Sequence, residues 1–180
     1  MFPMITDVHE LRQARAEMEA VHSALESEKR AHAWPIPLGI MIEVPSAAVL
    51  IEQLASSVEF FSIGTNDLTQ YVLAADRGNP GLAQFHDALH PAILRLISRI
   101  TRAAHKEGKH VGICGEAASD PVAASLFIGL GVDELSLAPS LIPKIKESIR
   151  TIARRDVEAL AAEAEDLATA ADVRALMSRK

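Results

Sequence analysis

Short apolar segments alternate with helical stretches along most of this 180-residue chain, and this alternation constrains its fold more than any other feature. The predicted strands are 2–5, 38–42, 60–63, 110–114 and 134–137. Strands separated by stretches of helical periodicity are typical of right-handed βαβ units, which build a parallel sheet. The sequence therefore predicts an α/β fold with about five parallel strands.

The intervening stretches have the spacing and the boundary residues of helices. The predicted helices are 8–25, 46–56, 68–74, 91–108, 121–129 and 140–152, the last capped by Ser140, and one or two more in the tail 156–180. In the first helix, Val8, Leu11, Met18, Val21 and Leu25 recur on one face. The strand 38–42 is apolar on both faces, which predicts a buried parallel strand.

Chain length leaves two architectures open. A closed (β/α)8 barrel usually needs about 250 residues, so this chain is short for one. The residues alone allow an open sheet or part of a barrel. With 49% hydrophobic residues, the chain can bury a core and does not have the composition of a disordered protein.

Charge and cysteine content exclude several classes of function. A net charge of −6 argues against a nucleic-acid partner, because binding phosphate backbones needs a basic patch. Cys114, the single cysteine, cannot form an internal disulfide, which is typical of a reducing compartment. No apolar run approaches the roughly 20 residues of a membrane helix, and the first residues do not have the pattern of a signal peptide. We expect a cytoplasmic protein without membrane insertion.

Polar side chains follow three of the predicted strands at the points where the strands end. Glu43 follows the second strand, Asn66 and Asp67 follow the third, and Cys114 ends the fourth. Parallel strands bring their carboxyl ends to one edge, where ligands bind in both open α/β sheets and barrels. We therefore expect these four side chains to converge there.

Each of these residues also has a simpler interpretation. Asp67 could cap the following helix, Glu43 could be a solvated loop residue, and Cys114 could be a small buried apolar side chain. Arg77 is by default a surface charge, and charges in the tail, such as Arg174, are interpreted as a solvated face. The seven histidines show no metal-binding pattern; those at 9, 22 and 32 are placed on the first helix.

Four segments carry a resemblance to a known family. They are GIMIEVP at 39–45, FFSIGTNDLTQY at 60–71, DRGN at 76–79 and GICGE at 112–116. In these segments the chain resembles the phosphoenolpyruvate-utilising enzymes, and within them it is most similar to enzyme I of the sugar phosphotransferase system, the phosphoenolpyruvate–protein phosphotransferases. The resemblance extends from residue 1 to about 152 and more loosely through the tail.

The resemblance implies a fold and a division of the chain. Residues 1–154 would be the carboxyl-terminal part of a phosphoenolpyruvate-binding (β/α)8 barrel, beginning at the fourth strand of the family's barrel. Residues 155–180 would be a carboxyl-terminal helical extension. A partial barrel of this kind leaves sheet edges unpaired, so we expect the chain to self-associate as a homo-oligomer.

The resemblance also implies roles for individual residues. Glu43 and Asp67 would ligate Mg²⁺, which prefers hard oxygen ligands. Asn66, Asp67 and Arg77 would bind the substrate, with the Arg77 guanidinium clamping phosphate oxygens. Cys114 would be the catalytic general acid that protonates the enolate of pyruvate, since a cysteine thiol is mostly protonated near neutral pH.

The implied reaction needs partners outside this chain. Phosphoenolpyruvate would transfer its phosphoryl group to a histidine on a separate phosphohistidine domain, releasing pyruvate and supplying a phosphocarrier protein for sugar uptake. One alternative is a non-catalytic dimerisation module made from a truncated barrel. Others are a fragment of a pyruvate phosphate dikinase or phosphoenolpyruvate synthase, and a metal-dependent lyase or aldolase on the same barrel edge.

Overall fold

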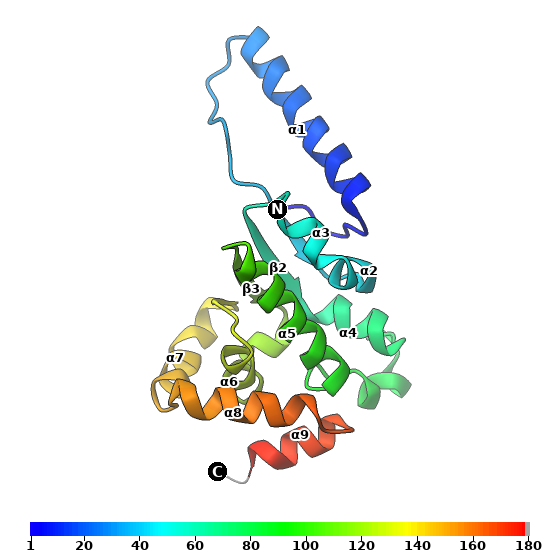
Figure 1. Cartoon of the computed structure of the whole chain (residues 1–180), viewed down its shortest axis with the longest axis vertical. Helices are drawn as coiled ribbons and strands as arrows, with labels where there is room; N and C mark the ends of the chain where they lie inside the picture. The colour runs from blue at the N-terminus through cyan, green and yellow to red at the C-terminus, as the bar shows by residue number, and fades with distance from the viewer. Residues whose placement is uncertain (179–180) are drawn as a thin grey trace.

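A parallel sheet lies at the centre of the computed structural model, which describes residues 1–178 (Figure 1). Its four strands are β1 (Gly39–Ile42), β2 (Phe60–Gly64), β3 (His110–Cys114) and β4 (Glu134–Ser136). They are adjacent in the order of the chain, and each neighbouring pair is parallel. This order has no reversal of the kind that marks a doubly wound sheet. The predicted α/β fold is confirmed, and the strand order is that of a section of a (β/α)8 barrel.

The predicted strand 2–5 is wrong as a strand. Phe2 alone pairs in parallel with Ile40, at the outer edge of β1. Its backbone forms two hydrogen bonds with β1, of 2.9 and 2.8 Å. The pairing stops because Met4 has a left-handed backbone (φ +56°) and donates its N–H to the side chain of Glu43. A fifth segment therefore lies in barrel order, but only one of its residues is paired.

Helices follow the strands at the predicted places. They are α1 (Val8–Ser27), α2 (Pro45–Val49), α3 (Ile51–Ala55), α4 (Thr65–Leu73), α5 (Pro91–Lys106), α6 (Pro121–Gly129), α7 (Ile142–Arg150), α8 (Arg154–Glu165) and α9 (Ala170–Met177). The predicted helix 46–56 is split at Leu50. Ser140 caps no helix, because it lies in a 3-10 turn (Pro139–Leu141) before α7. Among residues 1–178, no helix has the length and apolar character needed to span a membrane.

The sheet buries one face more completely than the other. Ile40, Phe61 and Ile113 are fully buried and belong to the same core as side chains of α3 and α5. Met41, Ser62 and Cys114, on the opposite face, are only half-buried. The prediction of a buried parallel strand at 38–42 is confirmed for every residue except Met41, which lies on the half-buried face. The helices that pack on these strands cover the other face. The second face and its carboxyl edge are accessible.

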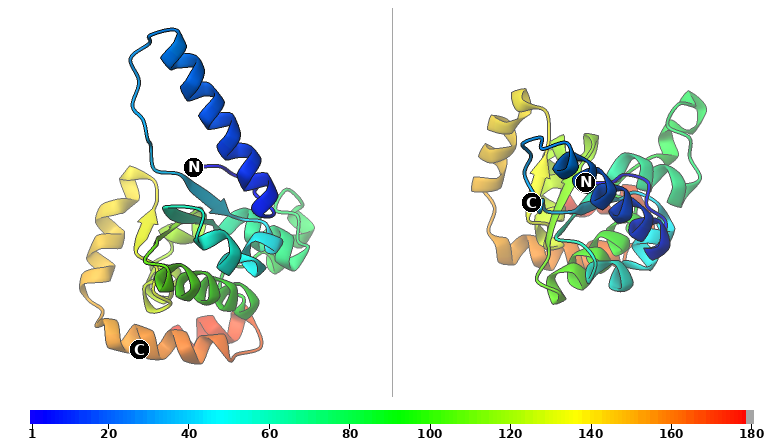
Figure 2. Two further views of the ribbon diagram at one scale, coloured as in Figure 1. Left: turned by 45° about the horizontal axis from the view of Figure 1, so that its top comes forward. Right: turned by 90° about the horizontal axis from the view of Figure 1, so that it is seen from above.

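Helix α1 and the return segment, residues 28–38, extend away from the sheet as an arm (Figures 1 and 2). The apolar face predicted for this helix meets the core only in part: Leu11 is buried in it and Val8 and Met18 pack against it, whereas Val21 is 57% exposed. Met18 and Trp34 line a hollow between the helix and the return segment. Since α1 ends at Ser27, His32 lies on the return segment and not on the helix as predicted.

The last two helices pack against the rest of the chain at the end opposite the arm (Figure 1). Arg174 of α9 forms a bidentate pair with Asp87, at 2.9 and 3.0 Å, and a third contact with Asp120 at 3.3 Å. The hydrogen bond with Asp87 raises the pKa of the Arg174 guanidinium, and Asp120 adds to this effect. The Arg174 side chain is nevertheless 46% exposed, so the interpretation of this tail charge as part of a solvated face holds, with the ion pairs to Asp87 and Asp120 in addition. The division of the chain at residues 154 and 155 stays a prediction.

Asp133, in the turn before β4, connects α5 to β3. Its Oδ2 accepts hydrogen bonds from His105 Nε2 at 2.8 Å and from the backbone N–H of Val111 at 2.9 Å. Burial alone would raise the pKa of Asp133, but the hydrogen bonds from His105 and Val111 outweigh it, so this pKa lies below its usual value of 3.8. The charged form of Asp133 therefore stabilises the folded state fully at pH values above this usual pKa. That contribution is lost as the pH falls through the lower pKa of the folded state.

We expect Asp133→Asn to lower the free energy of unfolding at neutral pH by about 0.5 to 1 kcal/mol, a small effect because water screens this partly exposed side chain. The difference from the unsubstituted chain should shrink as the pH becomes more acidic than the unfolded-state pKa. Urea denaturation at several pH values measures this. A difference that stays constant down to strongly acidic pH would show that the carboxylate charge contributes nothing.

Candidate functional site

The strand register brings the ends of the strands into one row at the carboxyl edge of the sheet. Gly64 pairs with Cys114, and Cys114 pairs with Ser136. Ile42 pairs with Ile63, so Glu43 directly follows the last pair between β1 and β2 and lies next to Gly64. The predicted placement of Glu43 and Cys114 at one edge of the sheet is thereby observed, and Asn66 and Asp67 follow Gly64 in the first turn of α4 (Thr65–Leu73).

Glu43 is nearly buried, with 4% of its surface exposed. Its Oε1 accepts a hydrogen bond from the backbone N–H of Met4 at 2.8 Å, the one hydrogen bond to this carboxylate found within residues 1–178. A Cβ atom at Gly64 would lie 2.9 Å from Glu43 Oε2, so the absence of a side chain there makes room for the carboxylate. A buried carboxylate with one donor keeps lone pairs free to bind a cation.

The Cys114 thiol lies between β2 and β3 on the accessible face. Its Sγ donates to the carbonyl oxygen of Ile63 and accepts from Ser62 Oγ, each at 3.6 Å. The backbone carbonyl of Cys114 accepts a hydrogen bond from Thr65 Oγ1 at 2.9 Å. These contacts orient a half-buried thiol at the edge of the sheet, where a ligand could reach it. The interpretation of Cys114 as a fully buried apolar side chain is wrong.

Asn66 connects the start of α4 to the turn after β3. Its Oδ1 accepts a hydrogen bond from the backbone N–H of Glu116 at 3.1 Å, and its carbonyl oxygen bonds to His86 Nε2 at 3.1 Å. With Oδ1 occupied, the amide nitrogen remains as the donor of this side chain. Gly115 makes the approach possible, because a Cβ there would lie 2.9 Å from Asn66 Oδ1 and would clash with Thr65 Oγ1.

Asp67 and Arg77 lie beside each other next to this edge. Asp67 is in the first turn of α4, whose N-cap is Gly64, so the interpretation of Asp67 as the cap is wrong. Its Oδ1 is 3.8 Å from a terminal guanidinium nitrogen of Arg77, and both side chains are partly exposed. The Arg77 backbone N–H also donates to Gln70 Oε1 at 3.1 Å, which attaches the loop to α4. A pair this long and exposed contributes little stability and leaves both groups able to contact a ligand.

The structure does not gather all predicted residues around one cavity. A shallow depression of about 540 Å³ at the edge is lined by Asn66, Gly115 and Ser136, among others, but not by Glu43, Asp67 or Arg77. Within residues 1–178, the one group of three potential metal ligands close together is His22, Glu26 and His32, on the arm. Glu43 and Asp67 would thus need water or substrate oxygens to complete a metal's coordination.

Comparison with known proteins settles the family. The family described as PEP-utilising enzyme, PEP-binding domain, where PEP is phosphoenolpyruvate, matches residues 1–154. This chain belongs to the PEP-utilising enzymes. A phosphoenolpyruvate-protein phosphotransferase of Haemophilus influenzae is 45% identical over 173 residues, which cover 96% of this chain and 30% of that protein. A multiphosphoryl transfer protein of Xanthomonas campestris pv. campestris is 48% identical over 180 residues, 100% of this chain and 21% of that protein.

This PEP-utilising chain therefore spans less than a third of the length of these two relatives. Among solved structures, a citrate lyase from Burkholderia xenovorans LB400 superposes with a TM-score of 0.60 at 22% identity, over 98% of this chain and 60% of that one. At this identity, the likeness concerns the fold alone.

Sequence reasoning missed three residues that shape this PEP-utilising domain's edge: Ser62, Thr65 and Gly115. Ser62 and Thr65 place hydroxyl groups on the thiol and the carbonyl of Cys114. Ser62 places a hydroxyl inside the otherwise apolar strand 60–63, which indicates that one face of this strand contacts a polar group. Thr65 and Gly115 gave no such signal, because their contacts join segments 49 or more residues apart.

We expect Gly115→Ala to lower the free energy of unfolding by about 2 kcal/mol, because the residue has φ +114° and its new Cβ would crowd Thr65 and Asn66. Gly108→Ala is the matched control: φ there is +67° but nothing lies within 4 Å of a Cβ, so we expect about 1 kcal/mol. Urea denaturation measures both. Equal losses would mean that the close approach of Asn66 to this turn does not limit stability.

Proposed function

We propose that this PEP-utilising domain binds phosphoenolpyruvate and Mg²⁺ at the carboxyl edge of its sheet, as the substrate-binding part of a phosphoenolpyruvate–protein phosphotransferase. The observation that carries the proposal is the alignment of the carboxyl ends of β1, β2 and β3. There the nearly buried carboxylate of Glu43, the half-buried thiol of Cys114 and the amide of Asn66 follow or end adjacent parallel strands. The names of the two relatives support the reaction class, and the match over 1–154 supports the ligand.

Glu43 and Asp67 would hold the metal. Among residues 1–178, the Glu43 carboxylate has one hydrogen bond and Asp67 has only a long contact with Arg77, so both keep oxygen atoms for a cation. This all-oxygen donor set fits Mg²⁺, which binds one or two carboxylates and takes its other ligands from water and substrate. When bound, Mg²⁺ supplies positive charge that neutralises the oxygens of the phosphate and the developing enolate.

The remaining residues would bind the substrate and move one proton. Arg77 would turn from Asp67 to the phosphate oxygens, which a guanidinium binds through two parallel hydrogen bonds. The Asn66 amide would donate to a phosphate oxygen. As the phosphoryl group passes from the enol oxygen to a histidine nitrogen, a P–O bond breaks and a P–N bond forms. Cys114 Sγ then gives its proton to the methylene carbon of the enolate, which yields pyruvate, and regains a proton from water.

The phosphoryl acceptor in this proposal belongs to other parts of the phosphotransferase. It is a phosphohistidine domain, which would pass the group to a phosphocarrier protein for sugar uptake. A second copy of this chain is the other proposed partner, because the outer edge of β4 offers backbone groups for association.

Calorimetric titration of the chain with phosphoenolpyruvate, with and without Mg²⁺, tests the proposal. We expect saturable binding of roughly micromolar to millimolar affinity that disappears when the metal is chelated. Pyruvate should compete weakly, because it has no phosphate for Arg77 and Asn66. If phosphoenolpyruvate does not bind at any Mg²⁺ concentration while the chain forms a stable dimer, the dimerisation alternative is correct instead.

A further inference from the structure

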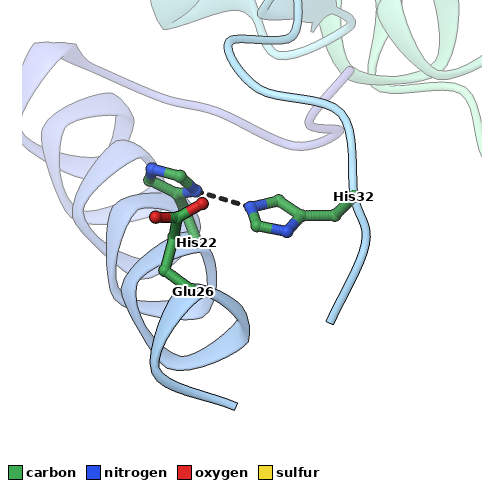
Figure 3. Close-up of side chains that lie close together, drawn as sticks. All are labelled: His22, Glu26 and His32. Atoms are coloured by element: carbon green, nitrogen blue, oxygen red, sulfur yellow. Dashed lines mark hydrogen bonds between the residues drawn. The ribbon is translucent and has the colours of Figure 1, made fainter. Parts of the chain in front are cut away.

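Two segments of the arm bring together three side chains that the function proposed above does not use. His22 and Glu26 are one turn apart on α1, and His32 is on the return segment (Figure 3). One potential ligand atom from each lies within 4.8 Å of the others. His22 Nδ1 is 2.7 Å from His32 Nε2, so the two imidazoles share one hydrogen bond.

The hydrogen bonds of His32 orient its ring as a metal ligand. His32 Nδ1 is 2.8 Å from the carbonyl oxygen of Arg30, which can only accept, so this nitrogen carries the proton. His32 Nε2 therefore presents its lone pair to His22. A hydrogen bond from the far ring nitrogen to a carbonyl is the usual way in which proteins orient a metal-binding histidine.

Trp34 packs against the ring of His22. Its indole stacks on the imidazole of His22 with ring centres 4.4 Å apart and planes 8° from parallel. Trp34 also comes from the return segment, so both the stacking and the hydrogen bond connect the same two parts of the arm. These contacts lie where α1 extends beyond the core, and the segment that contains them leads into the amino end of β1 (Figure 1).

We propose that His22, Glu26 and His32 form a binding site for Zn²⁺ or a similar divalent transition metal, which holds the return segment against α1. Two imidazole nitrogens and one carboxylate are a known zinc donor set, with water as the fourth ligand. Mg²⁺ is disfavoured there because it prefers oxygen. The site is separate from the edge of the sheet, where Glu43 and Asp67 offer oxygen atoms only.

Metal binding at this cluster requires a small rearrangement with a simple proton balance. Zinc–nitrogen distances of about 2.0 to 2.1 Å in a tetrahedral site put two ligand nitrogens about 3.3 Å apart, slightly farther than the present hydrogen bond. The ion takes the place of the proton that His22 Nδ1 shares with His32. That proton moves to His22 Nε2, so the ring stays neutral and both facing nitrogens offer lone pairs.

Trp34, the single tryptophan, makes the site directly observable. The full chain carrying Cys114→Ser, without a polyhistidine tag and freed of metal, is titrated with Zn²⁺ while tryptophan fluorescence and heat are recorded. We expect one equivalent to bind and to change the fluorescence, and Mg²⁺ to do neither. Co²⁺ should give the visible absorption of a tetrahedral site. A histidine pair that is only hydrogen-bonded and binds no metal would not produce this absorption.

Variants then assign the ligands. His32→Ala and Glu26→Gln should each weaken Zn²⁺ binding at least about tenfold. His9→Ala, which removes an exposed histidine from the same helix, should change nothing. Equal affinity in all of these chains, or no stoichiometric binding in the parent, would overturn the proposal and leave the two histidines as a hydrogen-bonded pair. Phosphoenolpyruvate binding measured in the His32→Ala chain should be unchanged, so this proposal and the proposed function fail independently.

Discussion

Asp67→Asn is expected to abolish Mg²⁺-dependent phosphoenolpyruvate binding, with a loss of affinity of roughly 100-fold or more. Asparagine keeps the size of the side chain but removes the negative charge, and a neutral amide is a poor substitute for a carboxylate ligand of Mg²⁺. The change also removes the charge that faces Arg77 at 3.8 Å. A loss of about 3 kcal/mol in binding free energy corresponds to this factor. Calorimetric titration with phosphoenolpyruvate at saturating Mg²⁺ measures it.

A structural role of Asp67 would give a different result. As an acidic residue in the first turn of α4, Asp67 stabilises that helix by at most about 1 kcal/mol, so the folded state should survive the substitution. Asp166→Asn makes the same charge change at an exposed site at the end of α8 and should leave binding intact. Retained binding in the Asp67 variant would remove this residue from the metal site and favour the non-catalytic alternative.

Gly129→Ala is expected to lower the free energy of unfolding by about 3 kcal/mol, although alanine is the better helix former. Gly129 ends α6 where α8 crosses it, and a Cβ there would clash with the carbonyl oxygen of Val157 and lie 2.9 Å from the Cβ of Ala161. A backbone carbonyl cannot rotate away as a side chain can. Helix α8 must therefore shift, which opens the packing between α6 and α8. Urea denaturation followed by circular dichroism measures the loss.

Gly112→Ala provides the control for this substitution. The atoms nearest to a Cβ at that position are 3.7 Å away, an ordinary van der Waals contact, so we expect a much smaller change. Faster amide hydrogen exchange in α8 of the Gly129 variant would show that the loss of stability arises from the packing between α6 and α8. An unchanged unfolding midpoint would mean that the helices after residue 154 are loosely attached, which would favour their description as a separate extension.

Much of the fold could be predicted because periodicity is a local property. The strands at 39–42, 60–64 and 110–114 and helix α5 follow from apolar spacing and from proline and glycine at their boundaries. The predictions that failed concern contacts between segments. Phe2 forms a bridge rather than a strand because Met4 bonds to Glu43, 39 residues away. The apolar face of α1 was predicted along the whole helix, but it meets the core only as far as Met18, because the rest of the helix extends beyond the core.

For the candidate site, the residues could be selected from the sequence but their surroundings could not. Glu43, Asn66, Asp67 and Cys114 could be selected because each directly follows or ends a strand, and parallel strands end at one edge. Their environments could not be predicted, because Ser62, Thr65 and Gly115 act across the register between strands. The cluster on the arm was missed because His32 was placed on the helix, where it would lie far from His22.

By itself, the sequence determined the order of strands and helices, the family and the four polar positions at the strand ends, because these depend on residue type and on spacing along the chain. Only the tertiary structure decided which face of the sheet is open, how Glu43 is held by Met4 and Gly64, and that His22 meets His32. The physical reason is that these features depend on hydrogen bonds and close contacts between segments brought together by folding, whose partners no local pattern specifies.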